Sequence, residues 1–145
     1  MRSSVVLLVT LAALAALGLA AATSSAATSA TPGFYGCRVY TSKHPVAVVR
    51  PRSIIVACAD ANFYLTGIRW TTWAAAKATG TGTGHQNDCK PNCAAGHFHT
   101  YPATLTLTKP RACDGHSVFT TLAWHFTKPT PTGYALSGAT TFNCD

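Results

Sequence analysis

The chain has 145 residues, with 11 Lys or Arg against 4 Asp or Glu, and its formal net charge is +7. This length fits one small domain rather than several. The basic residues are scattered singly, apart from Arg50-Pro51-Arg52 and Lys109-Pro110-Arg111. The sequence therefore lacks the polybasic run that marks a specific nucleic-acid site, and solubility with loose attraction to anionic surfaces explains the charge.

The N-terminus has the three parts of a secretory signal peptide. Arg2 supplies an early positive charge, an uncharged run rich in Val, Leu and Ala extends from Val5 to Ala22, and small residues follow. A retained membrane anchor is the alternative, because the apolar run is about long enough to cross a bilayer. We expect a cleaved leader, and hence a secreted, extracellular protein that is free of the membrane after its removal.

This layout predicts three segments along the chain. The signal peptide covers 1–26, with cleavage as late as residue 30, and a short flexible segment covers 27–36. A single β domain is expected over 37–145. A domain of this size has a modest core, and secreted domains of this kind commonly add disulfides.

Beyond the leader, short runs rich in Thr, Val and aromatic residues alternate with turn formers. The candidate strands, in chain order, are Arg38–Thr41, Ser53–Cys58, Asn62–Trp73, Ala103–Lys109, Ser117–Thr127 and Tyr134–Cys144. Short strands at such spacing predict an all-β fold, a small antiparallel sandwich or barrel stapled by up to three disulfides. The one helical competitor, Thr72–Thr79, is short and uncapped.

Alternation along the strands predicts which side chains face the core. In Asn62–Trp73, one face would carry Tyr64, Thr66, Ile68 and Trp70, and the other Phe63, Leu65, Gly67 and Arg69. In Ala103–Lys109, the inward residues would be Ala103, Leu105 and Leu107. The run Gly80–Gly84 lacks the Lys and the following helix of a phosphate loop, and we interpret it as a flexible hairpin tip.

An even set of cysteines in an oxidising compartment predicts three disulfides. The six are Cys37, Cys58, Cys89, Cys93, Cys113 and Cys144. Six cysteines allow 15 pairings, and the sequence does not choose among them. Cys89 and Cys93 either close a small ring around Lys90-Pro91-Asn92 or reach different strands.

The segment around Cys89 and Cys93 is also the densest in imidazoles. Four potential zinc ligands recur every four residues: His85, Cys89, Cys93 and His97. Oxidised cysteines and the helix breakers Pro91 and Gly96 weigh against that site. A histidine-only copper or zinc site, made of His85, His97 and His99, is a weak alternative. Exposed histidines on a disulfide-pinned loop are the favoured interpretation, and we expect no cofactor.

Three motifs follow one another in the middle of the chain. They are Ala57-Cys58-Ala59-Asp60-Ala61-Asn62, Leu65-Thr66-Gly67-Ile68-Arg69-Trp70 with Trp73, and Asn87-Asp88-Cys89 with Pro91 and Cys93-Ala94-Ala95-Gly96. In this combination the chain resembles a functionally uncharacterised group of small secreted proteins of high-GC Gram-positive bacteria (actinobacteria). The resemblance covers roughly residues 50–110. It implies secretion and a shared small fold, and it transfers no catalytic residue.

Catalysis would have to depend on few acids, because the sequence contains no glutamate. Asp60, Asp88 and Asp114 each lie beside or two residues from a cysteine, where Asp commonly forms turns through backbone hydrogen bonds. A small secreted hydrolase using Asp and His is therefore the alternative function, and a histidine-based metal-binding protein is the third.

The favoured function is a binding or interaction module at the cell exterior. Trp70 and Trp73 have opposite parity in an extended strand, which would let one of them face outward and stack on a ligand. A core role for both is the favoured alternative, because tryptophans in a small β domain are more often buried. Asn87 and Asp88 would add the polar contacts that orient a ligand. A cell-wall glycan or an extracellular protein is the candidate partner, and we expect no specific nucleic acid.

Overall fold

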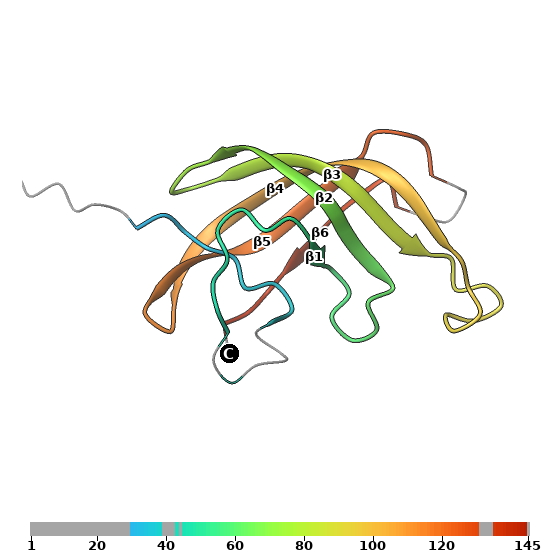
Figure 1. Cartoon of the computed structure of the whole chain (residues 1–145), viewed down its shortest axis with the longest axis horizontal. Coiled ribbons are helices and arrows are strands. Elements are labelled where there is room, and N and C mark those ends of the chain that lie inside the picture. The colour runs from blue at the N-terminus through green and yellow to red at the C-terminus, as the bar shows by residue number, and fades with distance from the viewer. Residues whose placement is uncertain (1–29, 39–42, 44, 131–134, 145) are drawn as a thin grey trace, which may run out of the picture.

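The computed structural model describes residues 30–38, 43, 45–130 and 135–144. The elements in this part of the chain are six strands, and each strand pairs antiparallel with the next to form one curved sheet, ordered β1 to β6 (Figure 1). The all-β fold class is confirmed, and its form is a half-barrel rather than a closed barrel. Within the same residues, no helix has the length and apolarity needed to span a membrane.

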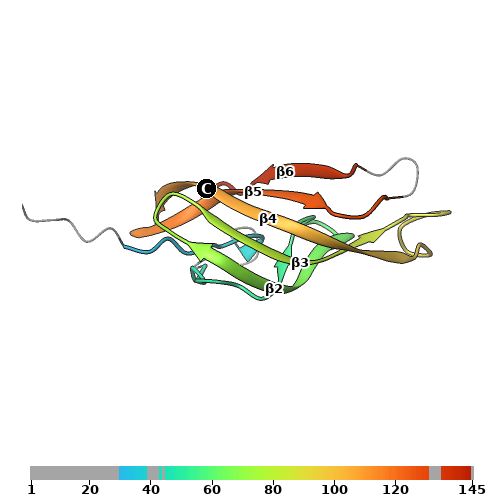
Figure 2. The ribbon, with the colours of Figure 1, turned by 90° about the horizontal axis from the view of Figure 1, so that it is seen from above.

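The strands differ greatly in length. They are β1 (Ile54–Ile55), β2 (Phe63–Trp73), β3 (Ala78–Asn87), β4 (Phe98–Cys113), β5 (His116–Phe126) and β6 (Ser137–Thr141). Figure 2 shows β2 to β6 following one another across the sheet. The long strands β2 to β5 form the body of the sheet, and the two shortest strands, β1 and β6, are its edges.

The pair β4–β5 follows the predicted alternation. Ala103, Leu105 and Leu107 are buried, and the residues opposite them on β5 include Leu122 and Phe126, which are buried as well. A two-residue turn, Asp114-Gly115, joins the strands with φ of 47° and 77°. Positive φ at both positions is the type I′ geometry that matches the twist of a hairpin.

Strand β2 departs from the predicted faces because it contains a bulge. Gly67 has φ 60°, and the pairing with β3 shifts register between Thr66 and Arg69. The extra residue reverses the alternation, so Leu65 and Ile68 both point into the core, at 0% and 5% exposure. The expectation that Leu65 and Ile68 lie on opposite faces is therefore wrong, since bulges change the facing of every residue beyond them.

The glycine run is a central strand rather than a hairpin tip. Gly80 and Gly84 lie in β3 with their Cα atoms facing large rings: a Cβ would come 3.0 Å from the Trp70 ring at Gly80 and 2.5 Å from the Phe126 ring at Gly84. Thr79, Thr81 and Thr83 alternate with the glycines along the same strand. The alternating glycines are thus the inward-facing residues of a strand, where the neighbouring rings leave no room for a side chain. The hairpin-tip interpretation is wrong.

The other candidate strands are shorter than expected. Ser53–Cys58 contributes only Ile54–Ile55, and the C-terminal candidate contributes Ser137–Thr141, with Tyr134 outside the described residues. Of the candidate Arg38–Thr41, only Arg38 lies within them. The helical competitor Thr72–Thr79 forms the end of β2, a connection and the start of β3.

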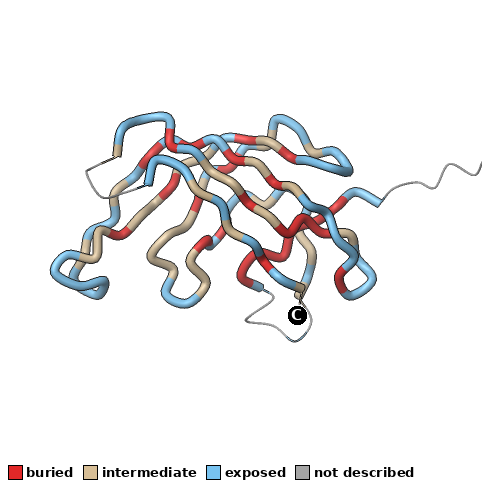
Figure 3. Tube along the Cα trace, turned by 180° about the vertical axis from the view of Figure 1, so that it is seen from behind, coloured by how far each residue is buried: buried red, intermediate tan, exposed pale blue. Residues whose placement is uncertain are grey.

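The open side of the half-barrel is covered by the segment Pro32–Cys37, which is buried throughout. Gly33 bonds β5 through its N–H to Ser117 O and through its C=O to Phe119 N, both at 2.9 Å. Phe34 is 3% exposed and packs edge-on against Phe142, with ring centroids 5.1 Å apart. Figures 1 and 3 show this segment beneath the arch of the sheet, where buried residues gather. Much of the segment that the sequence places ahead of the domain is therefore core.

Three disulfides are formed, as predicted, and the described residues contain no free cysteine. Cys37–Cys58 ties the covering segment to the β1–β2 connection, and Cys113–Cys144 ties the β4–β5 turn to the end of the chain. Cys89–Cys93 closes the small ring within the β3–β4 connection. Three disulfides in one small domain indicate an oxidising environment.

The covering segment leads to a first prediction. Phe34→Ala removes a fully buried ring, so we expect the free energy of unfolding to fall by about 3–5 kcal/mol. Phe98→Ala is the matched control, because Phe98 is 46% exposed and its truncation should cost less than about 1 kcal/mol. Urea unfolding monitored by tryptophan fluorescence measures both values. Equal losses in the two variants would contradict a core role for the covering segment.

The disulfides give a second prediction, based on loop length. Cys37 and Cys58 are 21 residues apart, whereas Cys89 and Cys93 are 4 apart. The chain-entropy model then assigns about 3 kcal/mol to the longer loop and about 2 kcal/mol to the shorter one. We expect the double Cys→Ser variant of the first pair to lose more stability in thermal unfolding than that of the second. The opposite order would show that the covering segment is held without its disulfide.

Candidate functional site

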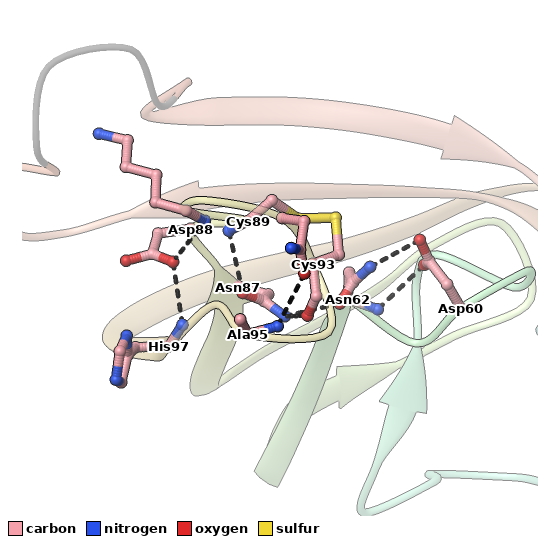
Figure 4. The surroundings of a disulfide bond; sticks show 10 residues. Asp60, Asn62, Asn87, Asp88, Cys89, Cys93, Ala95 and His97 are labelled. Atoms are coloured by element: carbon pink, nitrogen blue, oxygen red, sulfur yellow. Dashed lines mark hydrogen bonds between the residues drawn. A yellow bond between two sulfur atoms is a disulfide. The ribbon is translucent and has the colours of Figure 1, made fainter.

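The loop predicted to carry the polar site is organised around Asn87, the last residue of β3 (Figure 4). Its Nδ2 donates to Asn62 Oδ1 and to Cys93 O, both at 2.8 Å, and its Oδ1 accepts from Cys89 N at 3.0 Å. Asn87 is 7% exposed. Its amide thus satisfies backbone groups where the strand ladder ends, and it fixes the disulfide ring to the start of β2.

Asp88 performs a similar role on the other side of the loop. Its Oδ1 accepts from His97 N at 2.9 Å and from Lys90 N at 3.1 Å, and its Oδ2 lies 3.1 Å from His99 Nε2. The hydrogen bond from the His97 N–H, followed by those from the His99 ring and the Lys90 N–H, holds the pKa of the Asp88 carboxyl well below its usual range. The carboxylate is an acceptor for the loop's own donors.

Gly96 allows this close arrangement. A Cβ at this position would collide with Asn87 Oδ1 and would come 2.8 Å from Cys89 N. The loop backbone therefore passes directly over the two polar side chains. The ligand-orienting contacts predicted for Asn87 and Asp88 would have to compete with hydrogen bonds inside the loop.

The three histidines considered for a metal site do not share one location. His85 stacks on Tyr64, with centroids 4.5 Å apart and 7° between the planes, and its Nε2 lies 2.8 Å from Thr66 Oγ1. His99 pairs across from Gln86, the neighbour of His85, so His85 and His99 lie on opposite faces of the sheet. No group of three or more His, Cys, Asp or Glu in the described part of the chain could hold a metal ion.

Trp70 and Trp73 lie on the same face of β2, because a second register shift separates Trp70 from Thr72. The two rings pack edge to face at 4.8 Å and contact the core. Trp70 Nε1 donates to Pro51 O at 2.9 Å, and Trp73 Nε1 donates to Pro32 O at 2.8 Å. Both indoles therefore bind the non-strand segments to the sheet.

The predicted ligand-binding residues are thus divided between two ends of the sheet. Asn87 is the last residue of β3. Ala78 is its first residue, and it pairs with Trp73 of β2. At about 3.3 Å per residue, the ten residues of β3 separate these ends by about 30 Å. One ligand of ordinary size would not contact both the tryptophan pair and the disulfide loop.

A cleft beside Trp70 brings together three arginines that the sequence analysis treats as scattered charge. Its volume is about 410 Å³, and it is lined by Arg50, Arg52, Gly67, Ile68, Arg69 and Trp70. Two hydrogen bonds join its walls: Ile68 N donates to Arg52 O at 3.0 Å, and Trp70 Nε1 donates to Pro51 O. The Gly67 bulge places Arg69 beside the 50–52 segment. We call this site the arginine cleft.

The arginine cleft carries uncompensated positive charge. Arg50, Arg52 and Arg69 are exposed, and none of the described residues that line the cleft carries a carboxylate. Within the described residues the only ion pair is Asp88 with His99. Guanidinium groups present planar forks of N–H donors that match carboxylate, phosphate and sulfate oxygens. The arrangement can therefore bind an anion.

The sequence alone indicates part of the arginine cleft. Arg50-Pro51-Arg52 is one of its two paired basic motifs, but the third arginine is 17 positions beyond Arg52 along the chain. The two segments meet through the bulge at Gly67 and through the hydrogen bonds from Ile68 N to Arg52 O and from the Trp70 indole to Pro51 O.

Comparisons with known proteins identify no relative. The chain matches no protein-family model, and no curated protein or solved structure is similar to it. The resemblance to secreted actinobacterial proteins stays a prediction, and the function has to be inferred from the residues themselves.

The hydrogen bonds of Asp88 predict a dependence of stability on pH. Because its pKa is lowered in the folded state, the stabilisation is complete above the pKa of the unfolded carboxyl, about 3.9, and declines as the pH falls below it. Asp88→Asn should therefore be less stable than the native chain at about pH 7, and this difference should shrink at about pH 2.5. Urea unfolding at both pH values measures it. An unchanged difference would mean that the charge of Asp88 is not involved.

Proposed function

We propose that this protein is a secreted binding module of the cell exterior whose ligand is an anion held in the arginine cleft. The observation that carries the proposal is that Arg50, Arg52 and Arg69 line one cleft whose described lining contains no carboxylate. Like charges gathered in this way repel one another, so a bound anion relieves the repulsion as well as accepting hydrogen bonds.

Three features support export to the cell exterior. The first 26 residues have the layout of a cleaved signal peptide. The three disulfides suit an oxidising compartment. The motifs that resemble those of secreted actinobacterial proteins agree with export. An anionic cell-wall polymer is a ligand of suitable charge in that location.

A hydrolase is the second candidate, and the contact between Asp88 and His99 favours it, since the two side chains lie 3.1 Å apart. Asp88 also accepts hydrogen bonds from two backbone N–H groups of its own loop. Neither residue lines the arginine cleft or the neighbouring cavity described below. A loop-stabilising role accounts for the contact, and binding is the function that we propose.

The test is a titration with inorganic phosphate at low ionic strength, followed by NMR of the backbone amides and of the Trp70 indole N–H. We expect shifts centred on Gly67, Ile68 and Arg69. Removal of one charge in Arg69→Gln should weaken binding about fivefold to tenfold, because a charged hydrogen bond is lost. Added salt should weaken it further, since exposed charges are screened.

Arg111→Gln is the matched control, because Arg111 is exposed on β4, does not line the cleft, and its replacement changes the net charge equally. This variant should bind phosphate as the native protein does. Equal weakening in Arg69→Gln and Arg111→Gln would mean that diffuse charge attracts the anion, and the proposed site would be abandoned.

A further inference from the structure

A second cavity of about 320 Å³ lies between the covering segment and the start of β1. Much of its lining is apolar: Phe34, Val48, Pro51, Ile54, Ile55 and the Cys37–Cys58 disulfide. Ile55, one of these lining residues, is 47% exposed. The cavity therefore presents apolar surface to solvent.

The apolar cavity and the arginine cleft share one residue, Arg52. Pro51 lines the apolar cavity, and its C=O accepts the hydrogen bond from Trp70 of the cleft. Arg38 also lines the apolar cavity, and no aspartate in the described part of the chain lines either cavity. A positively charged site thus stands directly beside an apolar one.

We propose that the ligand is an amphiphilic anion, with its head group on Arg52 and a single short apolar chain or ring in the cavity beside the disulfide. This inference rests on the anion-binding function proposed above. Charge complementarity selects the anionic head, because the charged residues among the described lining of the two cavities are all arginines.

The volume limits the apolar part of the ligand. Since one water occupies roughly 30 Å³ in the liquid, a cavity of about 320 Å³ holds about ten groups of that size. That is enough for a short alkyl chain or an aromatic ring. It is too small for the two long chains of a membrane phospholipid, so the proposal is a free amphiphile.

The experiment compares methyl, butyl and hexyl phosphate by isothermal titration calorimetry with the full mature chain. The three compounds share one head group, so their affinities differ only through the apolar chain. Each fully buried methylene adds about fourfold to affinity. Because the cavity is partly open, we expect hexyl phosphate to bind at least tenfold more tightly than methyl phosphate.

A cavity-filling variant tests where the alkyl chain of the ligand binds. Ser53 is exposed and lines the apolar cavity, so Ser53→Trp should remove the dependence on chain length while methyl phosphate binds as before. Ser137→Trp is the matched control, because Ser137 is exposed on β6 and lines neither cavity. It should keep the native order of affinities.

Three outcomes separate this inference from the function on which it rests. Equal affinities for methyl and hexyl phosphate would overturn the amphiphile and leave the anion site standing. No binding of either compound would overturn both. Tight binding to vesicles of phosphatidylcholine and phosphatidylglycerol, unchanged in Ser53→Trp, would identify a membrane surface as the partner and overturn the free amphiphile.

Discussion

The structure depends on covering the concave face of a sheet that curves but does not close. A closed barrel has no edges and buries its inner face by itself, whereas here β1 and β6 are short and the inner face stays open. Phe34 fills this opening from a segment that belongs to none of the six strands and forms only isolated β-bridges, one of which joins Gly33 to β5. The core of this small domain is therefore completed by residues outside the sheet.

The same requirement creates the candidate binding site. The covering segment and the segment before β1 have few strand hydrogen bonds, and the two indoles of β2 hold them by donating to Pro32 O and Pro51 O. Pro51 lies between Arg50 and Arg52, so its hydrogen bond to Trp70 holds two arginines in the lining of the same cleft as Arg69. A contact that stabilises the fold thus also assembles the charge that we propose binds the ligand.

The sequence predicts the elements whose pattern is local, and it fails where distant side chains decide. β4, β5, the disulfide count and the all-β class follow from alternation and from cysteine number. The sequence does not predict β3, because its glycines are required by the rings of Trp70 and Phe126, which pack against them from other strands. The predicted assignment of β2 residues to the two faces of the sheet is wrong, because one bulge at Gly67 reverses the alternation beyond it. The arginine cleft depends on that same bulge, so the spacing of arginines along the sequence does not predict that Arg69 joins Arg50 and Arg52.

The scarcity of acidic residues explains why the arginines are available to a ligand. Each described aspartate has a local role: Asp60 accepts from Asn62 N and Nδ2, Asp88 anchors the disulfide loop, and Asp114 forms the β4–β5 turn. These roles need short, rigid contacts with neighbouring backbone, which keeps the carboxylates away from the cleft. Arg50, Arg52 and Arg69 consequently have no counter-charge among the described residues. The proposed anion site therefore depends on the aspartates being committed to the local structure that they stabilise.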